Sequence, residues 1–429
     1  MNPFVLAATG DSLVTQRLST IEEPEFLGVV EILRNADAAF TNLETTIHDG
    51  NAFPSAMCDG TWMVSPPCIA EELKWAGLRL LSRANNHALD WAVEGMRETT
   101  RLLDAQGLTH AGVGECLATA RQAAFRDTPA GRVAIISAAS TFPEWSRAGD
   151  ARKDIMGRPG LNPLRWAKVH LLSPQAFRAM HSIAAEVGIA VSDPGQHINL
   201  FDTVFIPWQS TGVGVQASPQ DLAGNLASVR DAREHADWLV VSLHTHEDSG
   251  NIHQPAPFAV TFARLCIENG ADVVLMHGAH VLRGIEIHEG KPIFYGLGNF
   301  IYQANLVGRL PADVFERFGL PADADDETVI AQFERAAANS CAHSIAGRSQ
   351  HLFGSGYSAL AQLRLSRRAP PEIRLYPLTL GPERSRALCG YPRLADGPLA
   401  EEIIKLLGDL SAPFGTTVVS RDGAAVVVP

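Results

Sequence analysis

The chain has 429 residues, of which 46% are hydrophobic and 19% charged, a composition that excludes global disorder and allows a large core. This length is enough for one large α/β domain or for two domains. The formal net charge of −12 argues against nucleic acid or an anionic membrane as the default partner. The six cysteines form no CxxC pair, no apolar run reaches the ~18 residues of a membrane helix, and the amino terminus lacks the features of a secretion signal. These features predict a cytoplasmic protein with reduced thiols.

Six short apolar runs that end in polar residues are predicted to be strands. They are Phe4–Thr9, Ala36–Glu44, Leu78–Leu81, Arg132–Ser140, Asp237–Glu247 and Ala271–His280. The first is expected to stop at Gly10. Helical segments are predicted between the runs, at Cys68–Ala76, Trp91–Gln106 and Phe258–Asn269. Gly107 and Gly270 follow the second and third of them as helix stops. Short strands that alternate with helices predict a layered α/β architecture.

Two segments interrupt this alternation, at about residues 145–226 and 311–350, and we interpret both as insertions over a common core. Long excursions of this kind often act as lids or partner surfaces, and structural ornament is the alternative. A hairpin is predicted at Glu289–Gly290. Two further strands, a helix over Pro398–Leu410 and a last hairpin at Arg421–Gly423 are predicted in the tail.

The polar residues at the ends of the predicted strands are carboxylates, imidazoles and amides. Ligands of open α/β sheets gather at the carboxyl ends of the strands, so these side chains are expected to converge. Carboxylate oxygens, imidazole nitrogens and amide oxygens are atoms that bind Zn²⁺, Mn²⁺ or Fe directly in proteins. The pattern therefore predicts a metal site, and the residues concerned are Asp11, Glu44, Asn86, His87, His244, His246, His277 and His280.

Each of these residues also has a structural interpretation. Asp11 could bond the backbone of a turn, and Glu44 could cap the segment that follows it. His244 and His277 could be core histidines with satisfied hydrogen bonds, although two imidazoles at equivalent strand ends favour ligands. The alternation of the strand does not assign His246 to either face.

A set of motifs in a fixed order carries a family resemblance. The motifs are GDS, NLE, ANNHALD, HAGVGE, SLHTHE, GADVVLMHGAHVLRG and YGLGNF, which span Gly10 to Phe300. Together they resemble the CapA (PgsA) family, named for poly-γ-glutamate capsule synthesis, which looks like a branch of the calcineurin-like metallophosphoesterase superfamily. The resemblance implies a four-layer α/β/β/α sandwich over residues 1–380, with the two insertions, and a C-terminal helix and hairpin over 381–429 packed on the same domain.

The resemblance also implies a site for one or two divalent ions, with Mn, Zn and Fe as the candidates. Asp11 would bind the first metal, Glu44 would bridge both, and His87 would be the acid for the leaving group. The implied metal ligands are Asp11, Glu44, Asn86, His244, His277 and His280. The implied catalytic pair is His87 and Asp90, and the residues expected to contact substrate are Asn85, His246 and Asn299.

The chain departs from the superfamily pattern in three places. Leu13 stands where the first motif has a histidine, which predicts one tight and one weak metal. His246 stands where CapA relatives usually have glycine, and it could be a replacement ligand or a substrate contact. The HGAH segment keeps His277 and His280 but lacks the middle histidine of the relatives.

A metal pair ~3.5–4 Å apart can hold a bridging hydroxide and polarise a scissile group, while a protonated His87 donates to the leaving group. This ligand set serves an amide and a phosphoester equally well. The family association favours a γ-glutamyl-like amide or a polymer, although an acidic protein is a poor electrostatic partner for a polyanion. The alternative is a non-catalytic accessory or binding protein of polymer synthesis, which the loss of a ligand at Leu13 favours.

Overall fold

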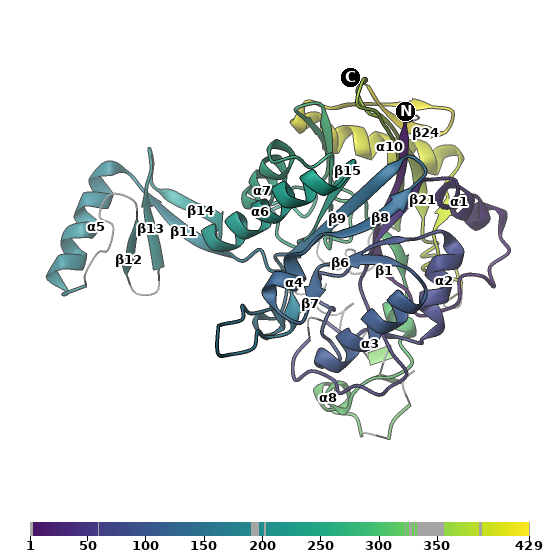
Figure 1. Ribbon diagram of the computed structural model, residues 1–429, viewed down its shortest axis with the longest axis horizontal. Helices are drawn as coiled ribbons and strands as arrows, with labels where there is room; N and C mark the ends of the chain where they lie inside the picture. The colour runs from purple at the N-terminus through teal and green to yellow at the C-terminus, as the bar shows by residue number, and fades with distance from the viewer. Residues whose placement is uncertain are drawn as a thin grey trace.

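The computed structural model describes residues 3–58, 60–189, 197–200, 203–321, 323–325, 328–329, 331–332, 356–385 and 388–428. Within these residues the chain forms a mixed α/β body around two large sheets, and a smaller sheet lies in an arm that projects from the body (Figure 1). Among the described helices, none is both long and apolar enough to cross a membrane.

The first sheet is parallel in one half and antiparallel in the other. Its strands, in order across the sheet, are β23 (Thr417–Arg421), β24 (Ala424–Val428), β21 (Glu372–Thr379), β20 (Tyr357–Leu365), β1 (Phe4–Leu13), β2 (Ala38–Leu43), β5 (Leu80–Ser82) and β6 (Thr109–Ala111), with β19 (Asn299–Tyr302) beside β1 and β22 (Arg393–Leu394) beside β21. Because β1, β2, β5 and β6 run parallel, their carboxyl ends meet at one edge.

The second sheet is also largely parallel. Its strands, in order, are β17 (Ile285–His288), β18 (Lys291–Phe294), β16 (Val273–His277), β15 (Trp238–His244), β9 (Gly131–Ala139) and β8 (Ala124–Thr128). All seven residues of β15 are buried, as expected for a strand with a partner on each side and a covered face above and below. The register of β15 and β16 pairs His244 directly with His277.

Apolar residues on the two faces of each sheet pack into two different cores. In β1, Phe4 and Leu6 enter the core between the two sheets, whereas Ala7 faces the helices on the outer side. The helices α1 (Pro24–Arg34), α2 (Cys68–Ala76) and α3 (Ala92–Ala105) supply that outer core of the first sheet. The helices α6 (Pro219–His235) and α7 (Pro257–Glu268) cover the outer face of the second sheet, and α10 (Gly397–Ser411) adds its apolar face to the core between the sheets.

The arm has a sheet, a helix and a small core of its own (Figure 1). Its strands, in order, are β12 (Ile198–Leu200), β13 (Thr203–Pro207), β11 (Trp166–Leu172) and β14 (Gly212–Ala217), and α5 (Pro174–Glu186) packs on them. The short elements of the body are β3 (Thr46–Ile47), β4 (Val64–Ser65), β7 (Val113–Gly114), α4 (Leu117–Arg121), η1 (Glu144–Ser146), β10 (Gly160–Leu161), η2 (Ala304–Leu306), α8 (Ala312–Arg317) and η3 (Ala412–Phe414).

The structure confirms the α/β class, the six strands, the three helices, both hairpins and the tail elements, with shifts of a few residues at their ends. The expected stop of the first strand at Gly10 is wrong. β1 continues to Leu13 because it gains β19 as a second parallel partner, and its register shifts between Asp11 and Ser12. In the interrupted segment 145–226 the arm occupies 166–217, and α6 returns to the body. Of the second interrupted segment, residues 333–350 lie outside the described residues.

Candidate metal centre

Carboxylates and imidazoles from both sheets meet at the shared carboxyl edge of the parallel strands. Asp11 lies near the end of β1, Glu44 directly follows β2, and His244 and His277 end β15 and β16. Three groups have ligand atoms that all lie within 4.8 Å of one another. The groups are Asp11 with His244 and His277, Glu44 with His244 and His246, and Asp11 with Glu44 and His280.

Asp11 is anchored through both of its carboxylate oxygens. Its Oδ1 accepts a hydrogen bond from Asn42 Nδ2 at 2.8 Å, and its Oδ2 accepts one from the backbone N–H of Gly278 at 2.9 Å. Burial raises the pKa of Asp11, but the hydrogen bond with His277 and the charges of the neighbouring histidines outweigh burial and lower it far below its usual range. Asp11 is therefore an ionised carboxylate inside the protein.

The histidines of the two paired strand ends face each other. Nδ1 of His244 lies 3.2 Å from Nδ1 of His277, and its Nε2 lies 3.0 Å from Nε2 of His246. Burial, then the charges of His246 and His277, hold the pKa of His244 well below its usual value, so its imidazole is neutral. Ser242 Oγ lies 2.6 Å from Nε2 of His277, which directs Nδ1 of His277 toward Asp11, 3.4 Å away.

The segment after β16 folds closely over the cluster. Gly278 has a φ of +99°, and a Cβ at this position would lie 2.8 Å from Cε1 of His244, so the close approach requires glycine. His280 also has a positive φ, of 58°. Its Nδ1 lies 2.7 Å from Oδ1 of Asn299, which fixes the ring, and its Nε2 lies 3.8 Å from Oε1 of Glu44.

His87 belongs to a separate pair beside this cluster. Its Nδ1 lies 2.6 Å from Oδ2 of Asp90, and that oxygen also accepts a hydrogen bond from the backbone N–H of Met63 at 2.7 Å. The backbone N–H of His87 donates to Oδ1 of Asn85, whose Nδ2 donates to Oδ1 of Asn42. Asp90 therefore orients the imidazole of His87. Asn85 connects the loop of His87, through Asn42, to the carboxylates of the cluster.

The remaining predicted residues are Asn86, Asn299 and His246. Asn86 is buried in the segment that follows β5. Asn299 lies behind His280 rather than on open surface, since it is 3% exposed. His246, predicted as a substrate contact with a ligand role as the alternative, has a ligand atom in one of the three groups.

Sequence reasoning missed two residues of the site. Asn42 donates to Asp11 and, at 3.3 Å, to Oε2 of Glu44. The period of two in a strand places Asn42 on the same side as Glu44, and this signal could have found it. The ring of Tyr302 packs edge-on against His280, with the ring centres 6.0 Å apart. Burial and the charge of Glu44 raise the pKa of Tyr302, so its phenol stays protonated.

Glu247 holds the loop that carries His246. Its carboxylate accepts hydrogen bonds from the hydroxyls of Ser140, Thr141 and Thr245 and, at 2.9 Å, from Nε1 of Trp166. The backbone N–H of His246 donates to the Thr141 hydroxyl at 2.8 Å. Because Trp166 begins the first strand of the arm, Glu247 joins the base of the arm to the metal centre.

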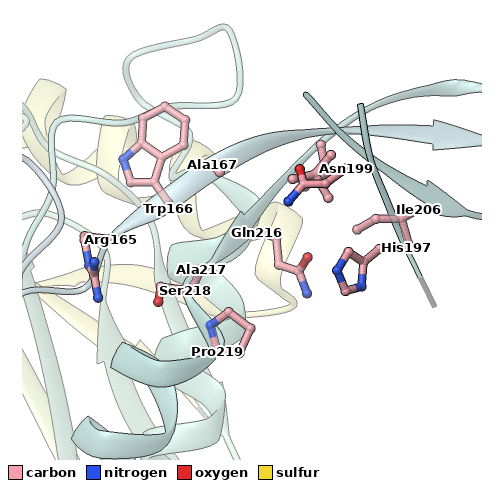
Figure 2. Close-up of a pocket in the computed structure, with 12 residues that line it drawn as sticks. Arg165, Trp166, Ala167, His197, Asn199, Ile206, Gln216, Ala217, Ser218 and Pro219 are labelled. Atoms are coloured by element: carbon pink, nitrogen blue, oxygen red, sulfur yellow. The ribbon is translucent and has the colours of Figure 1, made fainter. Parts of the chain in front are cut away.

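A cavity of about 520 Å³ lies on the arm side of this connection. Figure 2 shows the side chains of Gln216, His197 and Asn199 around it, with Arg165 and Trp166 at the body end. No carboxylate or imidazole of the three groups lines this cavity. It is therefore separate from the candidate metal centre, although Trp166 contributes to its wall.

Two packed sheets with a buried carboxylate and imidazole cluster at their shared edge define an α/β protein with a candidate metal centre. The sequence profile of the family described as "Bacterial capsule synthesis protein PGA_cap" matches residues 5–304. The chain therefore belongs to this family, which confirms the resemblance inferred from the motifs.

Several relatives cover the chain to different extents. The uncharacterized proteins y4sH and y4uA of Sinorhizobium fredii are each 36% identical to it over 434 aligned positions, which cover 99% of this chain and 93% of each relative. The PGA biosynthesis protein CapA of Bacillus subtilis is 27% identical, over 54% of this chain and 44% of that protein. A probable polyglutamine synthesis accessory protein of Mycobacterium tuberculosis is 27% identical, over 62% of this chain and 55% of that protein.

Proposed function

We propose that the chain is a metal-dependent hydrolase that cleaves an amide bond, of γ-glutamyl-like type, or a phosphoester bond. The observation that carries the proposal is the convergence of two buried carboxylates and four imidazoles beside the His87–Asp90 pair. We assign the body to the four-layer α/β/β/α sandwich of metallophosphoesterases. The helices packed outside both sheets support this assignment.

The donor set of the centre fits a pair of divalent cations such as Mn, Zn or Fe. Carboxylates with neutral imidazoles are the ligands that these ions share. Asp11, Glu44 and His280 would hold one ion, and Glu44, His244 and His246 would contribute to the other, with His277 and Asn86 as further ligands. A bound pair of divalent ions polarises the scissile group and lowers the pKa of water.

His246 would replace the ligand that is lost at Leu13. Leu13 is 3% exposed and packs in an apolar cluster with Trp62 and Val307, so its position offers no ligand atom. His246 presents Nε2 3.0 Å from Nε2 of His244 and belongs to one of the three ligand groups. The loop pinned by Glu247 would hold this imidazole in place.

His87 would carry the proton for the leaving group. Asp90 occupies Nδ1, so Nε2 is the nitrogen that can donate to a departing alkoxide or amine. The backbone N–H of Met63 shares the same Asp90 oxygen, which keeps the pair rigid. Tyr302 would offer a protonated phenol next to His280, suited to donating a hydrogen bond to a bound anionic group.

A second candidate function is an accessory role in polymer synthesis without hydrolysis. The apolar Leu13 at a ligand position favours it, and the Mycobacterium tuberculosis relative is named an accessory protein. Two Bacillus relatives are named PGA biosynthesis protein CapA, in Bacillus subtilis, and capsule biosynthesis protein CapA, in Bacillus anthracis, and both candidate functions agree with these names.

The test is a hydrolysis screen of protein loaded with Mn²⁺, Zn²⁺ or Fe²⁺. The substrates are nitrophenyl phosphate monoesters and diesters, γ-glutamyl nitroanilide and a γ-linked glutamate oligomer, with Asp11→Asn as the inactive control. We expect metal-dependent turnover of one class, lost in Asp11→Asn. Tight metal binding without turnover of any class would favour the accessory role, and absence of metal binding would contradict the metal centre.

A further inference from the structure

A cavity of about 330 Å³ lies at the edge of the first sheet opposite to the metal centre. Its wall includes the start of β2 and Arg79, which directly precedes β5. Since β2 and β5 direct their carboxyl ends to the metal centre, this cavity lies at their amino-terminal ends. The last turns of α1 and α2 and strand β8 complete the wall (Figure 1 labels these elements).

The cavity is positively charged, although the chain as a whole is acidic, with a net charge of −12. Four cations and two carboxylates line it: Arg34, Lys74, Arg79, Arg126, Asp37 and Asp127. Both carboxylates already have partners outside the cation set. Asp37 Oδ2 accepts a hydrogen bond from the backbone N–H of Val5 at 2.8 Å, and Asp127 pairs with Arg132, at 2.7 Å.

The four cations differ in the hydrogen bonds and ion pairs that they form within the protein. Arg34 donates to the carbonyl oxygen of Trp75 through two nitrogens and so caps the end of α2. Within the described part of the chain, neither Lys74 nor Arg79 forms an ion pair. Arg126 donates to a backbone carbonyl at 3.3 Å, and burial and then the charge of Arg79 lower its pKa. Two arginines of like charge therefore lie near each other in a partly enclosed space.

We propose that this cavity binds a compact polyanion, a small molecule with two or more phosphate or carboxylate groups, through Lys74, Arg79 and Arg126. Guanidinium groups match the oxygen geometry of both kinds of anion, and a bound anion would remove the repulsion between the two arginines. The volume is at the lower end for ligand cavities, which favours a small ligand. This site would be independent of the metal centre and of the proposed hydrolysis.

The experiment is calorimetric titration of the full-length, metal-free protein with pyrophosphate and, separately, with citrate, at constant ionic strength. We expect saturable binding of one molecule per chain. Arg79→Gln and Arg126→Gln should each weaken it by about tenfold or more, the scale of one lost hydrogen bond to a charged group. Arg421→Gln, at an exposed arginine of the final hairpin, is the matched control and should bind as tightly as the wild type.

Several outcomes decide between the interpretations. Tighter binding of pyrophosphate would identify a phosphate ligand, and tighter binding of citrate a carboxylate ligand. His277→Ala should bind the anion normally, and loss of binding there would place the anion at the metal centre and overturn the proposal. Absence of saturable binding to the wild type, or equal weakening by Arg421→Gln, would also overturn it. Lys74→Gln, on the surface end of α2, tests the cavity if either arginine variant fails to fold by circular dichroism.

Discussion

The edge of the two sheets and the projecting arm bury their residues to very different extents. Every residue of β15, which ends at His244, is buried, whereas every residue of β13 in the arm is only partly buried. Within the described residues, the separate apolar cluster of the arm contains five buried side chains: Leu172, Phe177, Ala184, Ile198 and Leu200. Free energies of local unfolding follow the number of buried apolar contacts, so the arm should open long before the sheet edge does. Metal ligands must be held in fixed positions, which the buried sheet edge provides. The arm is suited to contacts that tolerate movement.

The two regions are nevertheless connected through Trp166. Trp166 stacks on Phe258 of α7, with ring centres 5.6 Å apart, and donates to Glu247. Glu247 fixes the loop of His246, so the arm can influence this imidazole while Asp11 and His277 stay fixed by the sheets.

His277→Ala should abolish both metal binding and turnover at the sheet edge. His277 contacts Asp11, His244 and Ser242, and its loss removes a ligand from the centre of the cluster. We expect metal content, measured by mass spectrometry after dialysis, to fall together with turnover of every substrate. His288→Ala, at a partly exposed histidine of β17, is the control. Retention of full metal content would contradict the ligand assignment.

His87→Ala should separate proton donation from metal binding. Because Nδ1 of His87 is held by Asp90 and His87 is in none of the three ligand groups, metal content should stay almost unchanged. Turnover should fall by roughly 10²–10⁴-fold on substrates with poor leaving groups, the range of general acid catalysis. Nitrophenyl substrates need little protonation and should lose much less. An equal loss for both substrate types, or an emptied metal site, would show that His87 is not the acid.

Phe177→Ala should destabilise the arm without affecting the metal centre. Phe177 is 7% exposed in the small core of the arm, and a buried phenylalanine replaced by alanine typically costs about 3–5 kcal/mol. Hydrogen exchange followed by mass spectrometry should show faster exchange in β11 and α5, with unchanged protection of β15 and unchanged metal content. Loss of protection in β15 would show that the two regions unfold together.

His246→Ala should lower the affinity for one ion of the pair. Leu13 predicts one weakly held ion, and the position of His246 leads us to expect that the wild type retains two ions after dialysis and this variant nearer one. The affinity of the second ion should fall by at least the roughly 10–100-fold that loss of an outer-shell partner costs. A wild type that retains one ion would show that His246 does not replace the missing ligand.

The smallest expected effect concerns stability against pH, through His110 of β6. Burial, then the charge of Arg83, lowers the pKa of His110 to about 4 despite its contact with Asp104. Between about pH 6.5 and pH 4 the unfolded chain binds a proton here that the folded chain does not, so stability falls as the pH falls through this window. The contribution should be less than about 3 kcal/mol. His110→Gln should flatten the pH dependence of urea unfolding, and an unchanged slope would contradict the assignment.

Much of the fold was predictable because local patterns and tertiary packing agree. The helix at Cys68–Ala76 has the predicted bounds, and the Glu289–Gly290 turn joins β17 and β18 as expected. The strand that ends at His244 was predictable because a buried parallel strand is apolar on both faces. The first strand was misjudged at Gly10, where turn residues lie inside β1 because β19, almost 300 positions later, pairs with it.

The chemical groups at the strand ends are evident from the order of residues alone, because parallel strands share an edge of the sheet and their last residues directly follow apolar runs. Asp11, Glu44, His244 and His277 follow from that rule. Three other relations became visible only in the folded chain: Asn42 bridges the carboxylates, His246 joins Glu44 and His244, and Tyr302 lies against His280. These relations depend on distances between strands and loops that are far apart in the chain. Backbone register and side-chain packing set such distances, and no local pattern of residues encodes them.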